Sequence, residues 1–372
     1  MNDIFEEYLR EKEPQKKEKG YAWHTAIGLQ AVDGLKASDY LIDTARRNIE
    51  GDITFEEANQ LINSYYKENI SHTGNDRTEE ADKVSVRIAQ LLSEKSFVMS
   101  PAQYISIHAR LFEGIYKHAG KIRDYNISKS EWVLDGDSVM YGGASDLRAT
   151  LDYDISQERD FSYKNLSLEQ TIKHLAVFVS RLWQIHVFSE GNTRTTAVFF
   201  IKYLRTLGFD VTNDILAENA WYFRNALVRA NYTNLQKGVH ETTEYLEAFL
   251  RNLLLGEKNE LKNRYLHINC TLETPKCQEN HKNVTLDVTL DESIVLELIK
   301  ADPQITQEKI AASINKSSRT VKRTIDSLKS KGIISREGGK RFGYCHAASG
   351  FPRPARNRQN QGDLLGGDVF LR

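Results

Sequence analysis

Three side chains whose chemistry suits phosphate transfer lie within one short segment between two helical patterns. Its sequence is His186-Val187-Phe188-Ser189-Glu190-Gly191-Asn192-Thr193-Arg194-Thr195. The His186 imidazole titrates near neutral pH, so it can take a proton from an attacking hydroxyl group. Glu190 offers the carboxylate that Mg²⁺ typically needs beside phosphate oxygens, and Arg194 offers charge-assisted bonds to phosphate. Because the free N–H groups at the start of a helix favour an anion, the segment predicts a site for nucleotide phosphates.

Two simpler interpretations remain open for these residues. A histidine at a helix end is commonly structural, and Glu190 and Arg194 could form only a surface pair worth ~0.3–0.5 kcal/mol. The other histidines that we considered have no comparable neighbours. We predict structural or surface positions for His72, His108, His118, His174 and His240.

The elements that must position this segment are predicted to be mainly α-helical. Apolar residues recur at helical spacing over 38–51, where Gly51 suits a helix C-terminus, and Thr54 with Glu57 forms a capping-box pattern. Similar periodicity predicts further helices over 79–95, 101–116, 167–186, 192–207, 213–231 and 240–255. From Lys121 to Tyr141 the sequence alternates around the turn signal Asp135-Gly136, which predicts an inserted β-hairpin.

The segment from His186 resembles the signature of the Fic family, His-Pro-Phe-x-(Asp/Glu)-Gly-Asn-Gly-Arg-x-x-Arg. The resemblance extends from about Val84 to Leu255 and implies an all-helical core with the hairpin as a flap that receives an extended target segment. It also implies transfer of AMP from ATP to a Tyr, Thr or Ser hydroxyl of a target protein, with release of pyrophosphate. The roles it implies are His186 as general base, Glu190 as Mg²⁺ ligand, Phe188 as a core anchor, and Gly191, Asn192, Thr193 and Arg194 as contacts to the ATP phosphates.

Two positions depart from this signature: Thr193 replaces the second glycine and Ala197 replaces the last arginine. A side chain at 193 crowds the backbone that approaches phosphate, and the missing cation removes a contact to the γ-phosphate. The Doc branch of the family also lacks that glycine and is a protein kinase, so a Doc-like kinase is one alternative function. The other alternative is a DNA-binding regulator whose Fic core senses a nucleotide without transferring it.

A second resemblance concerns residues 46–51, whose sequence is Arg46-Arg47-Asn48-Ile49-Glu50-Gly51. They resemble the inhibitory helix of Fic proteins, Ser/Thr-x-x-x-Glu-Gly, in which the glutamate occupies the γ-phosphate pocket. The resemblance implies that Glu50 is inhibitory and that Arg194 holds it, since residue 197 is alanine. The alternative is that Glu50 is a surface charge at a helix end.

The C-terminal pattern is typical of a winged helix-turn-helix. Helices are predicted over 293–300, 306–314 and 317–331, and two strands between Ile333 and Tyr344 join at Gly338-Gly339. Residues 301–345 contain ten Lys and Arg against four Asp and Glu, which favours double-stranded DNA as a partner. The predicted DNA contacts are Arg319, Lys322, Arg323, Lys340 and Arg341. A dimerisation or protein-docking module is the alternative.

Length and composition limit the class of protein. The chain has 372 residues, a net charge of −1, 40% hydrophobic residues, 27% charged residues and three cysteines, which disfavours a disordered chain, a disulfide scaffold and a zinc finger. No stretch approaches the ~18 apolar residues of a membrane span, so we expect a cytoplasmic protein without a membrane partner, and a homo-oligomer remains open. The expected organisation is a charged arm over 1–20, an N-terminal helical unit over 21–70, a Fic core over 79–256, a linker over 257–284, a winged helix over 285–345 and a disordered tail over 346–372.

Overall fold

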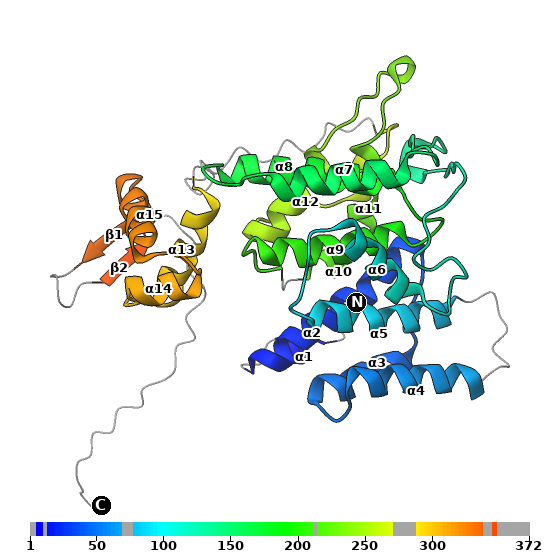
Figure 1. Cartoon of the computed structure of the whole chain (residues 1–372), viewed down its shortest axis with the longest axis horizontal. Helices are drawn as coiled ribbons and strands as arrows, with labels where there is room; N and C mark the ends of the chain where they lie inside the picture. The colour runs from blue at the N-terminus through cyan, green and yellow to red at the C-terminus, as the bar shows by residue number, and fades with distance from the viewer. Residues whose placement is uncertain are drawn as a thin grey trace, which may run out of the picture. The chain divides into compact units, whose positions relative to one another are not determined.

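The computed structural model describes residues 5–9, 13–68, 77–211, 214–270, 288–337 and 344–347. These residues are predominantly helical, as the sequence predicts, and they divide into a larger unit, Met1–Leu290, and a smaller one, Asp291–Arg372 (Figure 1). No helix in these ranges combines the length and the apolar composition that crossing a bilayer requires.

The N-terminal helices of the larger unit begin and end where local sequence signals predict. Ser38 Oγ accepts from the Leu41 N–H at 3.0 Å, and Gly51, with φ 91°, ends the helix. The capping box is confirmed, because Thr54 N–H donates to Glu57 Oε2 at 2.7 Å and Glu57 N–H donates to Thr54 Oγ1 at 3.1 Å. The elements are α1 (Glu6–Leu9), α2 (Pro14–Gly28), η1 (Leu29–Asp33), α3 (Asp39–Glu50), α4 (Phe55–Glu68) and α5 (Thr78–Ser93).

The charged arm predicted over residues 1–20 is wrong. Its described residues include α1 and the first half of α2, which packs against α5. Phe5 and Tyr8 are buried, and Lys16 Nζ lies 2.7 Å from Glu50 Oε2. The charges face solvent or partners on α3, while the apolar anchors lie before and after the charged run, so hydrophobic periodicity within the run is too weak to reveal the helix.

Helix α9 of the larger unit is buried along nearly its whole length. Every residue from Asn192 to Leu204 is buried, and α9 packs against α5, α6 and α8 (Figure 1). The helix predicted over 213–231 is divided at Asn219, and α7 was not predicted. The elements are α6 (Pro101–Phe112), η2 (Trp132–Leu134), α7 (Leu147–Asp160), α8 (Leu168–Ile185), α9 (Asn192–Thr206), α10 (Ile215–Glu218), α11 (Ala220–Arg229), η3 (Leu235–Lys237), α12 (Glu244–Leu255) and η4 (Asn263–Leu266).

Residues 121–143, called the flap segment below, contain no β-strand, so the predicted β-hairpin is wrong. The segment folds back on itself at η2 (Trp132–Leu134), which buries Val133 and Leu134. A side chain hydrogen-bonds to its backbone carbonyls where a β-ladder would otherwise do so. The guanidinium of Arg123 donates to the carbonyls of Tyr125 and Gly142 at 2.5 and 2.6 Å. The alternation in the sequence therefore reflects an extended loop with one buried turn.

The smaller unit has the element order of the predicted winged helix: α13 (Leu290–Ala301), α14 (Gln307–Ser313), α15 (Ser318–Ser330), β1 (Ile334–Glu337) and β2 (Tyr344–Ala347). The strands are antiparallel, with Ile334 opposite Ala347. Strand β2 therefore extends past residue 345, the predicted end of this domain. The predicted disordered tail from 348 to 372, residues 271–284 of the predicted linker and the Gly338-Gly339 turn lie outside the described residues.

Candidate active site

A short loop between α8 and α9 is fixed by two residues in the left-handed backbone region. His186 ends α8 with φ 51° and ψ 54°, and Gly191 precedes α9 with φ 76° and ψ 8°. A Cβ on Gly191 would lie 2.4 Å from two ring carbons of Phe112, so only glycine fits. The loop thus places the end of one helix and the free N–H groups of the next beside each other, as the sequence predicts.

Gly191→Ala is expected to destabilise the larger unit more than Gly51→Ala does. Both glycines have a positive φ, which costs alanine about 1–2 kcal/mol, but nothing lies within 4 Å of a Cβ at Gly51. Urea unfolding followed by tryptophan fluorescence measures the difference, because all four tryptophans lie before residue 290. Equal losses for the two variants would show that Phe112 moves aside at no cost.

Asn192 holds the loop closed with its own side chain. Its Oδ1 accepts from the Phe188 N–H at 3.0 Å, and its Nδ2 donates to the Phe188 carbonyl at 2.7 Å. Both ends of the amide are therefore engaged by the loop, and Asn192 holds the loop backbone in place. Phe188 is fully buried and stacks on the His108 ring at 3.7 Å, in agreement with its predicted role as an anchor.

His108, which was predicted to be only structural, supports the same loop. The Gly120 N–H donates to its Nδ1 at 2.8 Å, which leaves Nε2 to donate to the Glu190 carbonyl at 3.0 Å. Burial lowers the pKa of His108 to about 4, so the ring stays neutral and keeps this tautomer. Sequence offers no signal for this role, because His108 and Glu190 meet only through the packing of α6 on the loop.

The imidazole of His186 is buried among aromatic side chains. Its side chain lies between Tyr141, with ring centroids 4.2 Å apart, and Trp183, at 5.3 Å. Neither ring nitrogen bonds to any of the described residues. Burial, and then the positive charges of Lys129, Arg123 and Arg224, hold the pKa of His186 well below its usual value. His186 is therefore a neutral base with an unused lone pair at neutral pH.

Arg123 lies beside His186, although the sequence analysis included it only in the predicted hairpin and not among the site residues. Its Nε donates to the His186 carbonyl at 2.8 Å, and its backbone N–H donates to the Val187 carbonyl at 2.9 Å. A cation at the C-terminus of α8 also interacts favourably with the helix dipole. Arg123 thereby fixes the turn that orients the His186 ring.

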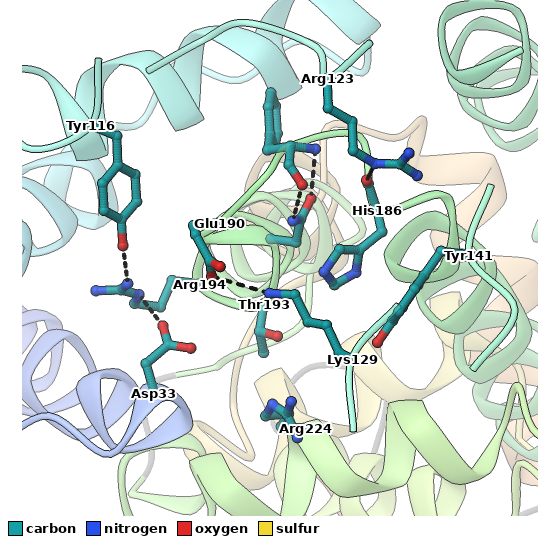
Figure 2. A network of polar contacts seen from close by, with 12 residues as sticks. Asp33, Tyr116, Arg123, Lys129, Tyr141, His186, Glu190, Thr193, Arg194 and Arg224 are labelled. Carbon is teal, nitrogen blue, oxygen red and sulfur yellow. Dashed lines mark hydrogen bonds and ion pairs between the residues drawn. The ribbon is translucent and has the colours of Figure 1, made fainter. Parts of the chain in front are cut away.

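Glu190 and Thr193 face different surroundings. The Glu190 side chain is about half exposed, and its Oε2 lies 3.1 Å from Nζ of Lys129 in the flap segment (Figure 2). Thr193 is buried, and its Oγ1 accepts from the Trp183 indole N–H at 3.0 Å. The hydroxyl that replaces the family's glycine is thus bonded to α8.

Arg194 does not face the open side of the loop. Its side chain is fully buried, with Nε 2.8 Å from Asp33 Oδ2 and Nη2 2.6 Å from Glu80 Oε1. Nη1 donates to Gln30 Oε1 at 3.0 Å, and Nη2 lies 3.2 Å from the Tyr116 hydroxyl. Burial opposes its charge, but Asp33, Tyr116 and Glu80 outweigh burial and hold the pKa of the guanidinium above its usual value. The guanidinium therefore faces these carboxylates in this structure, and its contact with the ATP phosphates stays a prediction.

The predicted pairing of Glu50 with Arg194 is wrong. Glu50 lies at the end of α3, where the ammonium of Lys16 and then the hydroxyl of Tyr8 lower the pKa of its carboxyl. Arg194 instead forms ion pairs with the carboxylates of Asp33 and Glu80. The Glu-Gly signature correctly marked a helix end at Gly51, but the long-range partners of both side chains come from other elements.

The predicted DNA contacts on the third helix of the smaller unit are presented to solvent. Arg319, Lys322 and Arg323 are all exposed on α15, while Val321, Ile325 and Leu328 are buried on its other side. The two wing cations, Lys340 and Arg341, lie outside the described residues.

Known proteins match the two parts of the chain separately. Residues 98–204 match the family model described as Fic/DOC family, and residues 294–335 match the winged helix-turn-helix DNA-binding model. A probable protein adenylyltransferase of Sinorhizobium fredii, y4lH, is 28% identical over 129 residues, which cover 35% of this chain and 64% of that protein. The crystal structure of a Fic family protein from Desulfovibrio desulfuricans G20 is 13% identical, covers 94% of each chain and has a TM-score of 0.44.

The matched ranges coincide with the elements described above. The Fic/DOC range runs from the residues before α6 to the end of α9 and includes His186, Glu190 and Arg194. The winged-helix range runs from α13 into β1. This chain therefore has a domain around the His186 loop that matches the Fic/DOC family model, followed along the sequence by a domain that matches the winged helix-turn-helix model.

Proposed function

We propose that this chain transfers AMP from ATP to a Tyr, Thr or Ser hydroxyl of a target protein. The observation that carries the proposal is the buried, neutral imidazole of His186, whose ring nitrogens have no partner among the described residues, beside the N-terminus of α9. A neutral base and an anion-binding helix end are the two groups that phosphate transfer to a hydroxyl requires. The adenylyltransferase name of the S. fredii relative favours AMP as the group transferred.

The proposed reaction has one bond formed and one bond broken at phosphorus. The target hydroxyl oxygen attacks the α-phosphorus of ATP, and its proton passes to His186. The bond from the α-phosphorus to the bridging oxygen breaks, and pyrophosphate leaves. Arg123 and Tyr141 hold the His186 ring in place for this proton transfer, and the N–H groups at the start of α9 face the phosphate charge.

Mg²⁺ fits this site as a partner of the nucleotide. No group of three His, Cys, Asp or Glu side chains that could hold a metal ion occurs among the described residues, but Mg²⁺ is typically bound by one or two carboxylates together with phosphates and water. The half-exposed carboxylate of Glu190 is the donor that would hold it. When bound, the ion would neutralise phosphate charge.

ATP labelled separately at the α- and γ-phosphate tests the reaction. Label retained on protein only from α-labelled ATP supports AMP transfer. Label retained only from γ-labelled ATP identifies the Doc-like kinase instead. No retained label, with ATP bound, favours a nucleotide sensor. Under the proposal, candidate targets are best drawn from proteins with a hydroxyl residue in an extended segment, which the flap segment would hold.

We also propose that the winged helix binds double-stranded DNA through α15. The support is the exposure of Arg319, Lys322 and Arg323 on one helix and the match to a DNA-binding family. Charges of this kind contact phosphates and release counterions, so the affinity falls as salt rises.

Lys322→Ala and Arg323→Ala are each expected to lower the slope of log affinity against log salt by about 0.9, the value of one phosphate contact. Fluorescence anisotropy of the full chain on a duplex at several salt concentrations measures the slope. Lys258→Ala, an exposed lysine of the larger unit, is the control and leaves the slope unchanged. If the wild-type chain shows no binding at low salt, the winged helix acts as a protein-docking module.

A further inference from the structure

The motif cations of the nucleotide site are not available to phosphate in this structure. Residue 197 is alanine, and Arg194 has no exposed surface and faces two carboxylates, Asp33 and Glu80. A phosphate would have to compete with both carboxylates and enter a buried cluster to reach the guanidinium. The charge of a nucleoside triphosphate therefore needs a different cation.

Three other cations of the described residues act electrostatically on His186: Lys129, Arg123 and Arg224. Arg123 is buried and its guanidinium donates to backbone carbonyls on the flap segment and α8. Arg224 binds both oxygens of the buried Glu131, at 2.6 and 3.0 Å. Such a bidentate pair with a buried carboxylate is costly to break. Both arginines are therefore held by protein groups and do not turn toward a bound phosphate.

Lys129 differs from the two arginines in its exposure and in its partner. Its side chain is 28% exposed, and it pairs with the carboxylate of Glu190, itself 52% exposed, at 3.1 Å. Exposed ion pairs of this kind contribute only about 0–1 kcal/mol, so the ammonium exchanges easily onto a more highly charged anion. Its backbone N–H donates to Ser138 Oγ at 3.1 Å, which ties this part of the flap segment to the residues that return from η2.

The ammonium of Lys129 lies where a group that binds phosphate would be needed. Figure 2 shows its side chain pointing toward Glu190, at the loop that leads into α9. After burial, its charge is the largest influence that lowers the pKa of His186, which places the ammonium near the imidazole as well. An ammonium between the base and the metal-binding carboxylate lies where phosphate oxygens would meet both.

We propose that Lys129 is the phosphate-binding cation of this site and contacts the ATP phosphates from the flap segment. This assignment rests on the proposed AMP transfer, in which charge accumulates on the leaving pyrophosphate. A lysine binds phosphate as a compact point charge. The flap segment then does more than receive the target, because it supplies a charge to the nucleotide.

Titration of α,β-methylene ATP, a probe that cannot transfer AMP, tests the assignment in the full chain with Mg²⁺ present. Lys129→Met is expected to weaken binding about 10- to 150-fold, the range of one charge-assisted hydrogen bond. Lys129→Arg should retain most of the affinity. Lys121→Met, an exposed lysine of the same segment, is the matched control and should bind as the wild type does. Unchanged tryptophan fluorescence shows that each variant is folded.

Steady-state transfer from ATP by the same variants gives a second readout. The expected result is a raised KM for ATP in Lys129→Met with partial recovery in Lys129→Arg. Equal or tighter binding by Lys129→Met, or faster transfer, overturns the assignment. Lys129 would then only hold the Glu190 carboxylate through their ion pair. If the wild type transfers no AMP and Lys129→Met still weakens the probe, the proposed reaction fails and the binding assignment stands. Absence of probe binding by the wild type overturns both.

Discussion

His186→Ala is expected to lower the rate of AMP transfer by about 10²–10⁴-fold, the usual contribution of a general base, while ATP binds nearly as in the wild type. The imidazole acts on the attacking hydroxyl group, and phosphate binding in our proposal depends on the N–H groups of α9 and on Lys129. Single-turnover transfer from α-labelled ATP measures the rate, and titration with α,β-methylene ATP measures the affinity. His240→Ala, at an exposed histidine, is the control and should keep the wild-type rate.

The pH dependence follows from the direction of the His186 pKa. The base works only when it is neutral. Burial, followed by the charges of Lys129, Arg123 and Arg224, holds its pKa below 6.5, and the ring is packed between Tyr141 and Trp183. The acid limb of the wild-type rate profile is therefore expected below pH 6.5. A variant His186→Ala that transfers AMP at the wild-type rate, or a wild-type limb well above pH 6.5, contradicts the role of this residue.

Arg194→Met is expected to destabilise the larger unit by about 3–5 kcal/mol, since it leaves Glu80 and Asp33 beside an apolar side chain. Glu80 is 8% exposed and accepts from Arg194, Arg77 and Tyr116, so its carboxylate cannot move into water without disrupting the cluster. Phe112, whose ring lies 4.8 Å from the guanidinium, also loses its cation–π contact. Urea unfolding of the full chain, followed by tryptophan fluorescence, measures the loss.

The matched control is Arg110→Met. Arg110 also pairs with a glutamate, Glu94, through two hydrogen bonds, but both side chains are partly exposed, so the expected loss is about 0–1 kcal/mol. A double variant, Arg194→Met with Glu80→Gln, should recover part of the stability, because it removes one of the two carboxylates left facing the apolar side chain. If Arg194→Met keeps the wild-type stability but weakens α,β-methylene ATP, Arg194 is the phosphate contact that the family resemblance implies.

Local signals in the sequence predicted the parts of this structure that depend on neighbouring residues. The capping box at Thr54, the glycine end of α3 and the bonds from Asn192 to Phe188 all arise from contacts within a few residues. The amphipathic helices α8 and α15 were predicted from periodicity, because one face of each is buried.

Contacts between distant residues account for what the sequence did not reveal. Glu80 lies 114 positions from Arg194, so nothing near the motif shows that its arginine is buried among carboxylates. Helix α7 has few apolar positions, Leu147, Leu151 and Ile155 on one narrow stripe, and the packing of that stripe on α8 stabilises it. In the flap segment, Arg123 donates to backbone carbonyls that would be paired with a second strand in a β-hairpin. The alternation of residue types cannot indicate such a contact.

The cluster around Arg194 also decides how this protein can be divided or recombined. The family match begins at residue 98, but Gln30, Asp33 and Glu80 all precede it. A chimaera that takes only residues 98–204 would carry an interior guanidinium without its carboxylates. The unit that is exchanged as a whole is therefore larger than the matched domain. The helices before residue 98 must be kept together with the His186 loop, whether the exchange occurs in evolution or in protein engineering.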